Sequence, residues 1–351
     1  MKILHSADLH LDSPFAGLEP EQAAKLRRQQ RKLPEKLAAL CKAEKCDLVL
    51  LAGDLFDGAW TKESLDTLRF ALKDMAVPVF ISPGNHDFCG TDSPYLTEKW
   101  PENVHIFTRS VLESVTLPEL DCKIYGAGYR SMDCDPLLEG FQAEGDQRFH
   151  IGLLHGDAMR TGSTYCPITA DQVRNSGLDY LALGHIHKTG SFRSGCTLCA
   201  WPGCPMGRGF DEPDARGVLI VTLDTHAEAA FIELDLPRFY DISCSPSELS
   251  NLLPPVGNDH FYRITLTGEA ETPDLKALYG EFARFPNLEL RDRTVPPMDL
   301  WGCVGEDSLE GVFFRQLKDA LDAAEEDEKE TVTLAARIAR QILDGQEVVL
   351  P

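Results

Sequence analysis

Short apolar runs recur through the first 225 residues, and they constrain the fold more than any other feature of the sequence. The runs are four to six residues long and rich in Val, Ile and Leu, as is typical of strands buried on both faces. Helix-like stretches separate the early runs, over residues 20–45, with a break or kink expected at Pro34, and over residues 62–75. This alternation predicts an α/β fold in layers, in which β-sheets are flanked by helices. The runs cover residues 3–7, 48–52, 77–82, 150–154, 180–183 and 218–223.

The pattern changes near residue 237, where we place a domain boundary. Beyond it, strand-like and helix-like segments predict a smaller α+β module, over residues 239–243, 261–266, 275–284 and 288–291. Apolar residues then recur at helical spacing between residues 307 and 343, on both sides of a charged run, which predicts a helical hairpin. We therefore expect one domain at residues 1–237 and a second domain, ending in the hairpin, at residues 238–351.

Composition places the chain among soluble globular proteins. Hydrophobic residues make up 43% and charged residues 26% of its 351 residues, which excludes the disordered and fibrous classes. The sequence shows neither a signal peptide nor an apolar run approaching about 18 residues, so we expect a cytoplasmic protein without a membrane span. The net charge of −22 argues against nucleic-acid binding by a general basic surface. DNA binding would have to be local or supplied by a partner.

Several cysteines and histidines are expected to be structural. The eleven cysteines are odd in number and scattered, which indicates reduced thiols rather than a disulfide scaffold. The one tight group, Cys196, Cys199 and Cys204, lacks a fourth ligand, so small buried residues are favoured over a structural zinc site. His5 and His150 lie in apolar runs and are expected to be hydrogen-bonded core residues.

Side chains able to bind metal follow five of the predicted strands. Ligands of α/β proteins bind in the crevice outside the carboxyl ends of the strands, so these strand ends should converge. The chain would then bring Asp, Asn and His side chains to one place. The residues are Asp8 and His10, Asp54 and Asp57, Asn85, His86 and Asp87, His155 and Asp157, and His185 and His187.

The mixture of oxygen and imidazole donors suits borderline divalent ions such as manganese, iron or zinc. Two ions about 3.5 to 4 Å apart need a bridging group, which a carboxylate with two oxygens can supply, and Asp54 is the candidate. His185 and His187 would project to the same side of an extended segment, one toward each ion. Seven residues are too many donors for one ion but enough for two: Asp8, His10, Asp54, Asn85, His155, His185 and His187.

Five short motifs at these strand ends, in their order along the chain, resemble the calcineurin-like metallophosphoesterases. They are Asp-x-His, Gly-Asp-x-x-Asp, Gly-Asn-His-Asp, a single His before Gly, and Gly-His-x-His. A water or hydroxide bridging the two ions would attack phosphorus in line with the leaving oxygen. The resemblance implies that one ion is held by Asp8, His10, Asp54 and His187, and the other by Asp54, Asn85, His155 and His185.

Two residues of the Gly-Asn-His-Asp motif are expected to act in catalysis without binding metal. By the same resemblance, His86 would stabilise the transferring phosphoryl group or protonate the leaving oxygen. Asp87 would orient the His86 ring through a hydrogen bond. No substrate-binding residue is predicted.

Longer segments narrow the resemblance to one branch of the family. Asp57 is followed by Gly58 rather than by the Arg-Gly usual in the protein phosphatases, which disfavours that class. Residues 5–12, 53–57 and 179–188 resemble bacterial SbcD-type DNA repair exonucleases, above all their YhaO-like branch. This resemblance implies a nuclease subunit that acts on DNA with an SbcC-type coiled-coil ATPase and uses two manganese ions, with iron or zinc as alternatives.

The later sequence supports the same branch but departs from it at one position. Pro202-Gly203 and Gly207-Arg208 follow the final ligands, as in the YhaO-like proteins. The double-strand-break repair nucleases often carry His where this chain has Asp57, so phosphodiester hydrolysis in general is favoured over processive exonuclease activity. Residues 1–237 would be the nuclease domain and residues 238–351 a DNA-capping and partner-binding module.

Three functions stay open on the sequence alone. The first is a two-metal nuclease subunit in DNA repair, the second a phosphodiesterase for a small molecule such as a cyclic nucleotide, and the third a non-catalytic scaffold. The scaffold is disfavoured because every expected ligand is present. Arg27, Arg28, Arg31 and Lys32 could contact DNA phosphates or form a solvated helix face. The hairpin could dock on the ATPase or pack on its own module. Whether the first domain forms a homodimer is a separate open question.

Overall fold

The computed structural model describes residues 1–160, 162–213, 215–252, 256 and 259–348. The chain divides into two compact units, residues 1–239 and residues 240–351. None of the helices within the described ranges is long and apolar enough to cross a membrane.

The first unit contains a six-stranded sheet with the order β12-β11-β1-β2-β3-β4. Its strands are β1 (Lys2–Ser6), β2 (Leu48–Leu51), β3 (Val79–Ile81), β4 (Val104–Ile106), β11 (Gly217–Leu223) and β12 (Ala227–Glu233). β1 to β4 run parallel to one another, whereas β11 pairs antiparallel with both β1 and β12. The carboxyl ends of β1, β2 and β3 therefore lie at the same edge of this sheet.

A second six-stranded sheet has the order β5-β6-β7-β8-β10-β9. Its strands are β5 (Glu113–Leu117), β6 (Cys122–Gly126), β7 (Phe149–His155), β8 (Tyr180–Gly184), β9 (Gly190–Ser194) and β10 (Thr197–Trp201). β6, β7, β8 and β10 are parallel, and β5 and β9 pair antiparallel at the two edges. β7 and β8 thus also end side by side.

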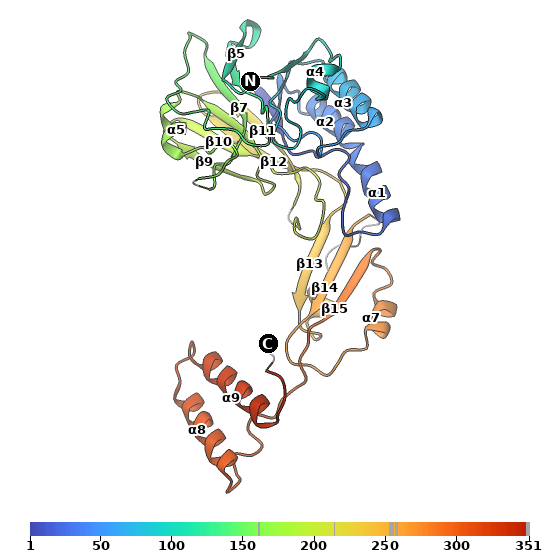
Figure 1. Cartoon of the computed structure of the whole chain (residues 1–351), viewed down its shortest axis with the longest axis vertical. Coiled ribbons are helices and arrows are strands. Elements are labelled where there is room, and N and C mark those ends of the chain that lie inside the picture. Colours follow the sequence, from blue (N-terminus) through green and yellow to red (C-terminus); the bar gives the residue numbers. More distant parts are fainter. Residues whose placement is uncertain (161, 214, 253–255, 257–258, 349–351) are drawn as a thin grey trace. The chain divides into compact units, whose positions relative to one another are not determined.

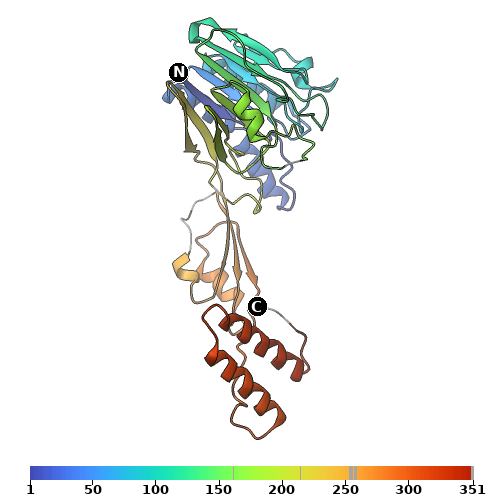
Figure 2. The ribbon, with the colours of Figure 1, turned by 90° about the vertical axis from the view of Figure 1, so that its left-hand side faces the viewer.

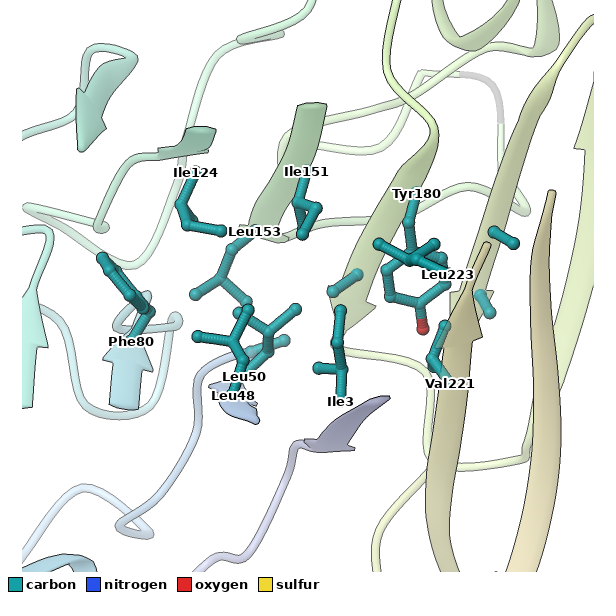
Figure 3. Close-up of a cluster of buried hydrophobic side chains, with 14 of the residues drawn as sticks. Ile3, Leu48, Leu50, Phe80, Ile124, Ile151, Leu153, Tyr180, Val221 and Leu223 are labelled. Carbon is teal, nitrogen blue, oxygen red and sulfur yellow. The ribbon is translucent and has the colours of Figure 1, made fainter. Parts of the chain in front are cut away.

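The main core lies between the two sheets. Figure 3 shows Ile3, Leu48 and Leu50 of the first sheet facing Ile151 and Leu153 of the second, all of them fully buried. Alternate residues of each strand point inward, and each buried aliphatic side chain contributes roughly 1.5–3 kcal/mol relative to an exposed one. This packing fixes the two sheets face to face and confirms that the apolar runs are buried strands.

Helices cover the outer faces of the sheets. They are α1 (Pro20–Gln30), α2 (Leu33–Ala43), α3 (Lys62–Met75), α4 (Pro94–Thr97) and α5 (Ala170–Asn175), with a 3₁₀ turn at Pro118–Leu120. Figure 1 shows α2 and α3 on one side of the unit and α5 on the other. Thr61 caps α3 by accepting a hydrogen bond from the backbone N–H of Ser64. The predicted layered α/β fold is confirmed.

The helical stretch expected to be broken or kinked at Pro34 is broken into two helices. α1 ends before Arg31, and Pro34 lies in the first turn of α2. A proline is tolerated there because the first backbone N–H groups of a helix have no intrahelical partner. The break therefore precedes the proline.

The second unit holds a small sheet and the predicted helical hairpin. The strands β13 (Phe239–Cys244), β14 (Phe261–Leu266) and β15 (Leu288–Asp292) form a sheet in that order, and β14 and β15 are parallel. Two short helices accompany them, α6 (Leu249–Leu252) and α7 (Leu275–Glu281). The hairpin consists of α8 (Leu309–Ala323) and α9 (Lys329–Leu343), which Figure 2 shows side by side.

Candidate metal centre

The structure brings all seven predicted metal ligands into one cluster. Loops after β1, β2 and β3 supply the ligands of the first sheet, and the ends of β7 and β8 supply those of the second. The donor atoms of Asp8, Asp54 and His155 lie within 4.8 Å of one another, as do those of Asp8, His10 and His187. Asn85 and His185 join the cluster through hydrogen-bond distances given below. The site therefore forms where the parallel edges of the two sheets meet.

Four of these ligands have a left-handed backbone. The φ angles of Asp8, His10, Asp54 and His185 are 52°, 45°, 51° and 89°. Such conformations are uncommon outside glycine and cost of order 1–3 kcal/mol each. Backbone hydrogen bonds hold two of the turns, from Asp8 N–H to the Gly53 carbonyl and from His10 N–H to the Asp54 carbonyl, both 2.9 Å. These strained backbone conformations direct the four side chains into the cluster.

Two glycines allow the loops to approach this closely. A Cβ at Gly84 would collide with the Asp54 carboxylate and lie 2.8 Å from a ring carbon of His155. A Cβ at Gly184 would collide with the Ala52 carbonyl oxygen, where β8 of the second sheet meets the loop after β2 of the first. Neighbouring groups approach both glycines too closely for any side chain to fit. This explains why a glycine precedes Asn85 and His185 in the two motifs.

His10 and His187 face one another through their Nε2 atoms, which are 3.2 Å apart. The Nδ1 atom of His10 lies 3.2 Å from Asp57, and the Nδ1 atom of His187 lies 2.6 Å from Glu212. Ionised carboxylates only accept hydrogen bonds, so each Nδ1 carries a proton, and a ring in its neutral form then presents a lone pair at Nε2. Two lone pairs at this distance repel each other. A cation between them, with Asp8 close by, would remove the repulsion.

His155 is also held through its Nδ1 atom, on the other side of Asp54. Its Nδ1 donates to the Ala52 carbonyl at 2.8 Å, which leaves Nε2 facing the Asn85 side-chain oxygen at 2.9 Å and Asp54 at 3.4 Å. His185 Nδ1 lies 3.3 Å from the same Asn85 oxygen. Burial alone would lower the pKa of His155, but the Asp54 carboxylate has the larger effect and raises this pKa to about 10. A positive charge is therefore strongly favoured between His155, Asp54 and Asn85.

Asp54 lies between the two groups. One of its carboxylate oxygens is 3.9 Å from His10 Nε2 and 3.4 Å from His155 Nε2, and the other accepts the His86 backbone N–H at 2.9 Å. Burial by itself would raise the pKa of Asp54, yet His155 and His10 hold that pKa well below its usual range. The carboxylate is therefore ionised, and it lies between the His10 and His155 nitrogens.

The partner of His86 is Asp57, whereas the sequence had suggested Asp87. His86 Nδ1 lies 3.0 Å from Asp57, the same oxygen that contacts His10. Asp87 is buried and accepts hydrogen bonds from the backbone N–H of Leu55 at 2.7 Å and of Gly84 at 2.8 Å, and from a tyrosine hydroxyl. Asp87 thus holds the loops after β2 and β3 together, because its side chain points into the protein.

Glu212 and Arg208 are site residues that sequence reasoning did not identify. Glu212 is buried, binds the ring of His187, and accepts the Arg208 backbone N–H at 2.8 Å. The Gly207-Arg208 pair was visible as part of the YhaO-like pattern, whereas Glu212 lies in no motif. Cys204 is buried beside them, 3.5 Å from Glu212. Cys196 is exposed and Cys199 buried, and among the described residues neither belongs to a group that could hold a metal ion.

Comparisons with known proteins identify the family of the chain. A model of the calcineurin-like phosphoesterases matches residues 1–189, and the chain belongs to this family of metal-dependent phosphoester hydrolases. An uncharacterized metallophosphoesterase, YhaO of Bacillus subtilis, is 33% identical over 260 residues, which are 69% of this chain and 61% of YhaO. The chain thus spans less than two thirds of YhaO.

Two further proteins are similar over comparable shares of the chain. The SbcD component of the nuclease SbcCD from Staphylococcus epidermidis is 29% identical over 64% of this chain and 67% of its own length. A solved structure of a dimetal phosphatase from Danio rerio aligns over 66% of this chain and 97% of that chain, with 12% identity and a TM-score of 0.45.

Proposed function

We propose that the first unit is a phosphodiesterase that uses two divalent metal ions. The observation that carries this proposal is the pair of Nε2 atoms of His10 and His187, which face each other 3.2 Å apart while a carboxylate holds each Nδ1. The mixed oxygen and nitrogen donors fit manganese, with iron or zinc as alternatives. When bound, the ions would polarise the phosphoryl oxygens and acidify a water. One ion would be held by Asp8, His10, Asp54 and His187, and the other by Asp54, Asn85, His155 and His185.

His86 would donate the proton to the leaving oxygen. Its Nδ1 faces Asp57, so Nε2 is the nitrogen presented outward, and the side chain is 41% exposed. The hydrogen bond to Asp57 is the main cause that raises the pKa of His86. The protonated ring is therefore favoured, which suits a general acid. Asp57 would act as a positioning residue for both His86 and His10.

A cavity of about 520 Å³ beside His86 supports a diester substrate. Trp60 and Phe88 line it together with His86 and other residues of the loops after β2 and β3. An organic group on the leaving oxygen would occupy this cavity, and an aromatic wall suits a nucleobase because every base offers a face for stacking.

DNA is the substrate class that the relatives favour. YhaO is named only as a metallophosphoesterase, but several similar proteins are named as the SbcD component of the nuclease SbcCD. On this ground we propose that the protein is a cytoplasmic DNA repair nuclease subunit that works with an SbcC-type ATPase. The second unit would cap the DNA and bind the partner, an assignment that rests on its place after the nuclease unit.

An apolar groove on the hairpin supports a partner-binding role. Leu309, Phe313, Ile342 and Leu343 line a cavity of about 550 Å³ between α8 and α9. These side chains are exposed, with Leu309 90% accessible. Contiguous apolar surface of this kind marks protein interaction sites, and paired helices commonly bind another helix along such a groove. The coiled coil of an SbcC-type ATPase fits this description.

The small-molecule alternative has one observation in its favour. The basic residues expected to touch DNA are partly engaged, since Arg31 pairs with Asp12 at 3.3 Å and with Glu63 at 2.9 Å. The net charge of −22 also disfavours binding of a DNA backbone by a general basic surface. A free nucleotide diester would need only the metal centre and the cavity beside His86.

Hydrolysis assays separate these functions. The wild type, Asp54→Ala, His86→Ala and the exposed control His226→Ala would be incubated with bis-p-nitrophenyl phosphate and with labelled duplex and single-stranded DNA, in manganese or in chelator. We expect manganese-dependent cleavage by the wild type and control, and its loss in the other two variants. Cleavage of the small diester alone would favour the small-molecule function. An inert wild type that binds two ions would overturn the proposal.

A further inference from the structure

Arg208 is a charged residue of the metal centre that the proposed chemistry has not used. It lies in the segment between β10 and β11, with its side chain 23% exposed. One terminal nitrogen lies 3.3 Å from Glu212, and the other lies 3.7 Å from Asp57. Glu212 binds His187 and Asp57 binds His86, so the guanidinium spans the distance between the metal-binding histidines and the proposed general acid.

The hydrogen-bonding capacity of Arg208 is not filled by the protein. A guanidinium has five N–H donors and no acceptor. Within the described residues, Nε is buried without a partner, and the contact to Asp57 is longer than a hydrogen bond. The terminal nitrogen near Glu212 also lies 3.0 Å from His187 Nδ1, but that atom donates its own proton to Glu212. Donors are therefore left over on a partly exposed cation at the centre.

Glu212 fixes where these donors point. Its Oε2 accepts the Arg208 backbone N–H at 2.8 Å, while Oε1 contacts both the Arg208 guanidinium and the His187 ring. Glu212 is itself buried, so its position and with it that of Arg208 is fixed by these contacts. A donor preorganised in this way loses little entropy on binding an anion.

We propose that Arg208 binds a non-bridging oxygen of the substrate phosphate, an inference that rests on the proposed phosphodiesterase function and deepens it. A diester carries one negative charge, and attack by water at phosphorus adds charge to its non-bridging oxygens. Arg208 stabilises that charge without giving up a proton, since a guanidinium remains protonated in proteins. The terminal nitrogen near Asp57 makes the contact, which places the phosphate between His86 and the metal-binding histidines.

The first test is binding of inorganic phosphate to the manganese-loaded protein, followed by calorimetry. Arg208→Gln and Arg208→Lys would be compared with the wild type and with Arg109→Gln, which changes an exposed arginine away from the centre. We expect Arg208→Gln to bind phosphate at least ~10-fold more weakly, with Arg208→Lys between it and the wild type. Manganese binding without phosphate should be close to that of the wild type, because Arg208 is not among the proposed ligands and does not contact the metal-facing Nε2 of His187.

The second test is catalytic. Arg208→Gln should lower kcat/KM for bis-p-nitrophenyl phosphate by about 10²-fold, the usual effect of removing one donor to developing charge. Added guanidinium ion should restore part of the activity of Arg208→Ala. Equal phosphate binding by the wild type and Arg208→Gln, or a loss of manganese binding in that variant, would overturn the inference. A wild type that binds phosphate but hydrolyses no diester would refute the proposed function, while the phosphate comparison still decides the role of Arg208.

Discussion

At the scale of single residues, the centre depends on carboxylates that fix imidazole tautomers. Asp57 and Glu212 hold the Nδ1 protons of His10 and His187, which leaves both Nε2 atoms as lone-pair donors. Partners of this kind orient metal ligands and raise their basicity, and their loss typically costs 10–100-fold in metal affinity. The site therefore extends beyond the seven predicted ligands.

Glu212→Gln should weaken manganese binding by roughly 10–100-fold, because a neutral amide holds the Nδ1 proton of His187 less strongly. Calorimetric titration of the metal-free protein measures this change. Glu228→Gln, which changes an exposed residue of β12, is the control and should bind manganese as the wild type does. Unchanged affinity in Glu212→Gln would mean that Glu212 does not orient the ring.

His5 links residue chemistry to stability. It is fully buried, donates from Nε2 to the Leu183 carbonyl at 3.1 Å, and accepts the Tyr180 hydroxyl at 2.7 Å through Nδ1. Burial lowers its pKa from 6.5 to about 3. The unfolded chain therefore binds a proton below pH 6.5 that the folded chain does not, so stability falls as pH drops from 6.5 toward 3.

Through His5, the free energy of unfolding should fall by about 2 kcal/mol between pH 6.5 and pH 5. Denaturant unfolding of the metal-free chain, compared with that of His5→Gln, isolates it, because all other titrating groups are shared. We expect the free energy of unfolding to fall less with acid in His5→Gln than in the wild type or in the exposed variant His226→Gln. Parallel pH profiles of all three proteins would contradict the assignment.

At the scale of elements, strand ends were predictable and irregular segments were not. The ligands Asp8, Asp54 and Asn85 follow apolar strands directly, so local pattern and the geometry of parallel sheets place them together. Glu212 reaches His187 from a segment 25 positions away that has no periodicity. The sequence also could not decide between Asp57 and Asp87 as the partner of His86, because that choice depends on side-chain direction within two packed loops.

Gly184 marks the contact between the elements that carry the ligands. Gly184→Ala should destabilise the first unit by about 1–3 kcal/mol, because the new methyl group would collide with the Ala52 carbonyl. It should also reduce manganese binding, since His155 bonds to the same carbonyl. Thermal unfolding and metal titration measure both effects. Gly280→Ala, where a Cβ meets open space in α7, is the control and should be neutral or slightly stabilising.

At the scale of the whole molecule, the two units are proposed to divide chemistry from partner binding. Phe313→Glu in the hairpin groove should abolish binding to an SbcC-type ATPase, because a charge would be buried against an apolar partner helix. Co-purification of the two proteins measures this. Phe70→Glu, which changes an exposed phenylalanine of α3, should leave binding intact. Hydrolysis of a small diester should be equal in both variants, and full partner binding by Phe313→Glu would place the interface elsewhere.

The most direct test of the account is the number of manganese ions bound by the metal-free chain and by Asp54→Ala, determined by calorimetric titration. Asp54 lies between the two groups of ligands, within 3.9 Å of His10 and 3.4 Å of His155. The wild type should bind two ions per chain, and Asp54→Ala at most one. A single ion in the wild type, or two ions in Asp54→Ala at wild-type affinity, would contradict a two-metal phosphodiesterase bridged by this carboxylate.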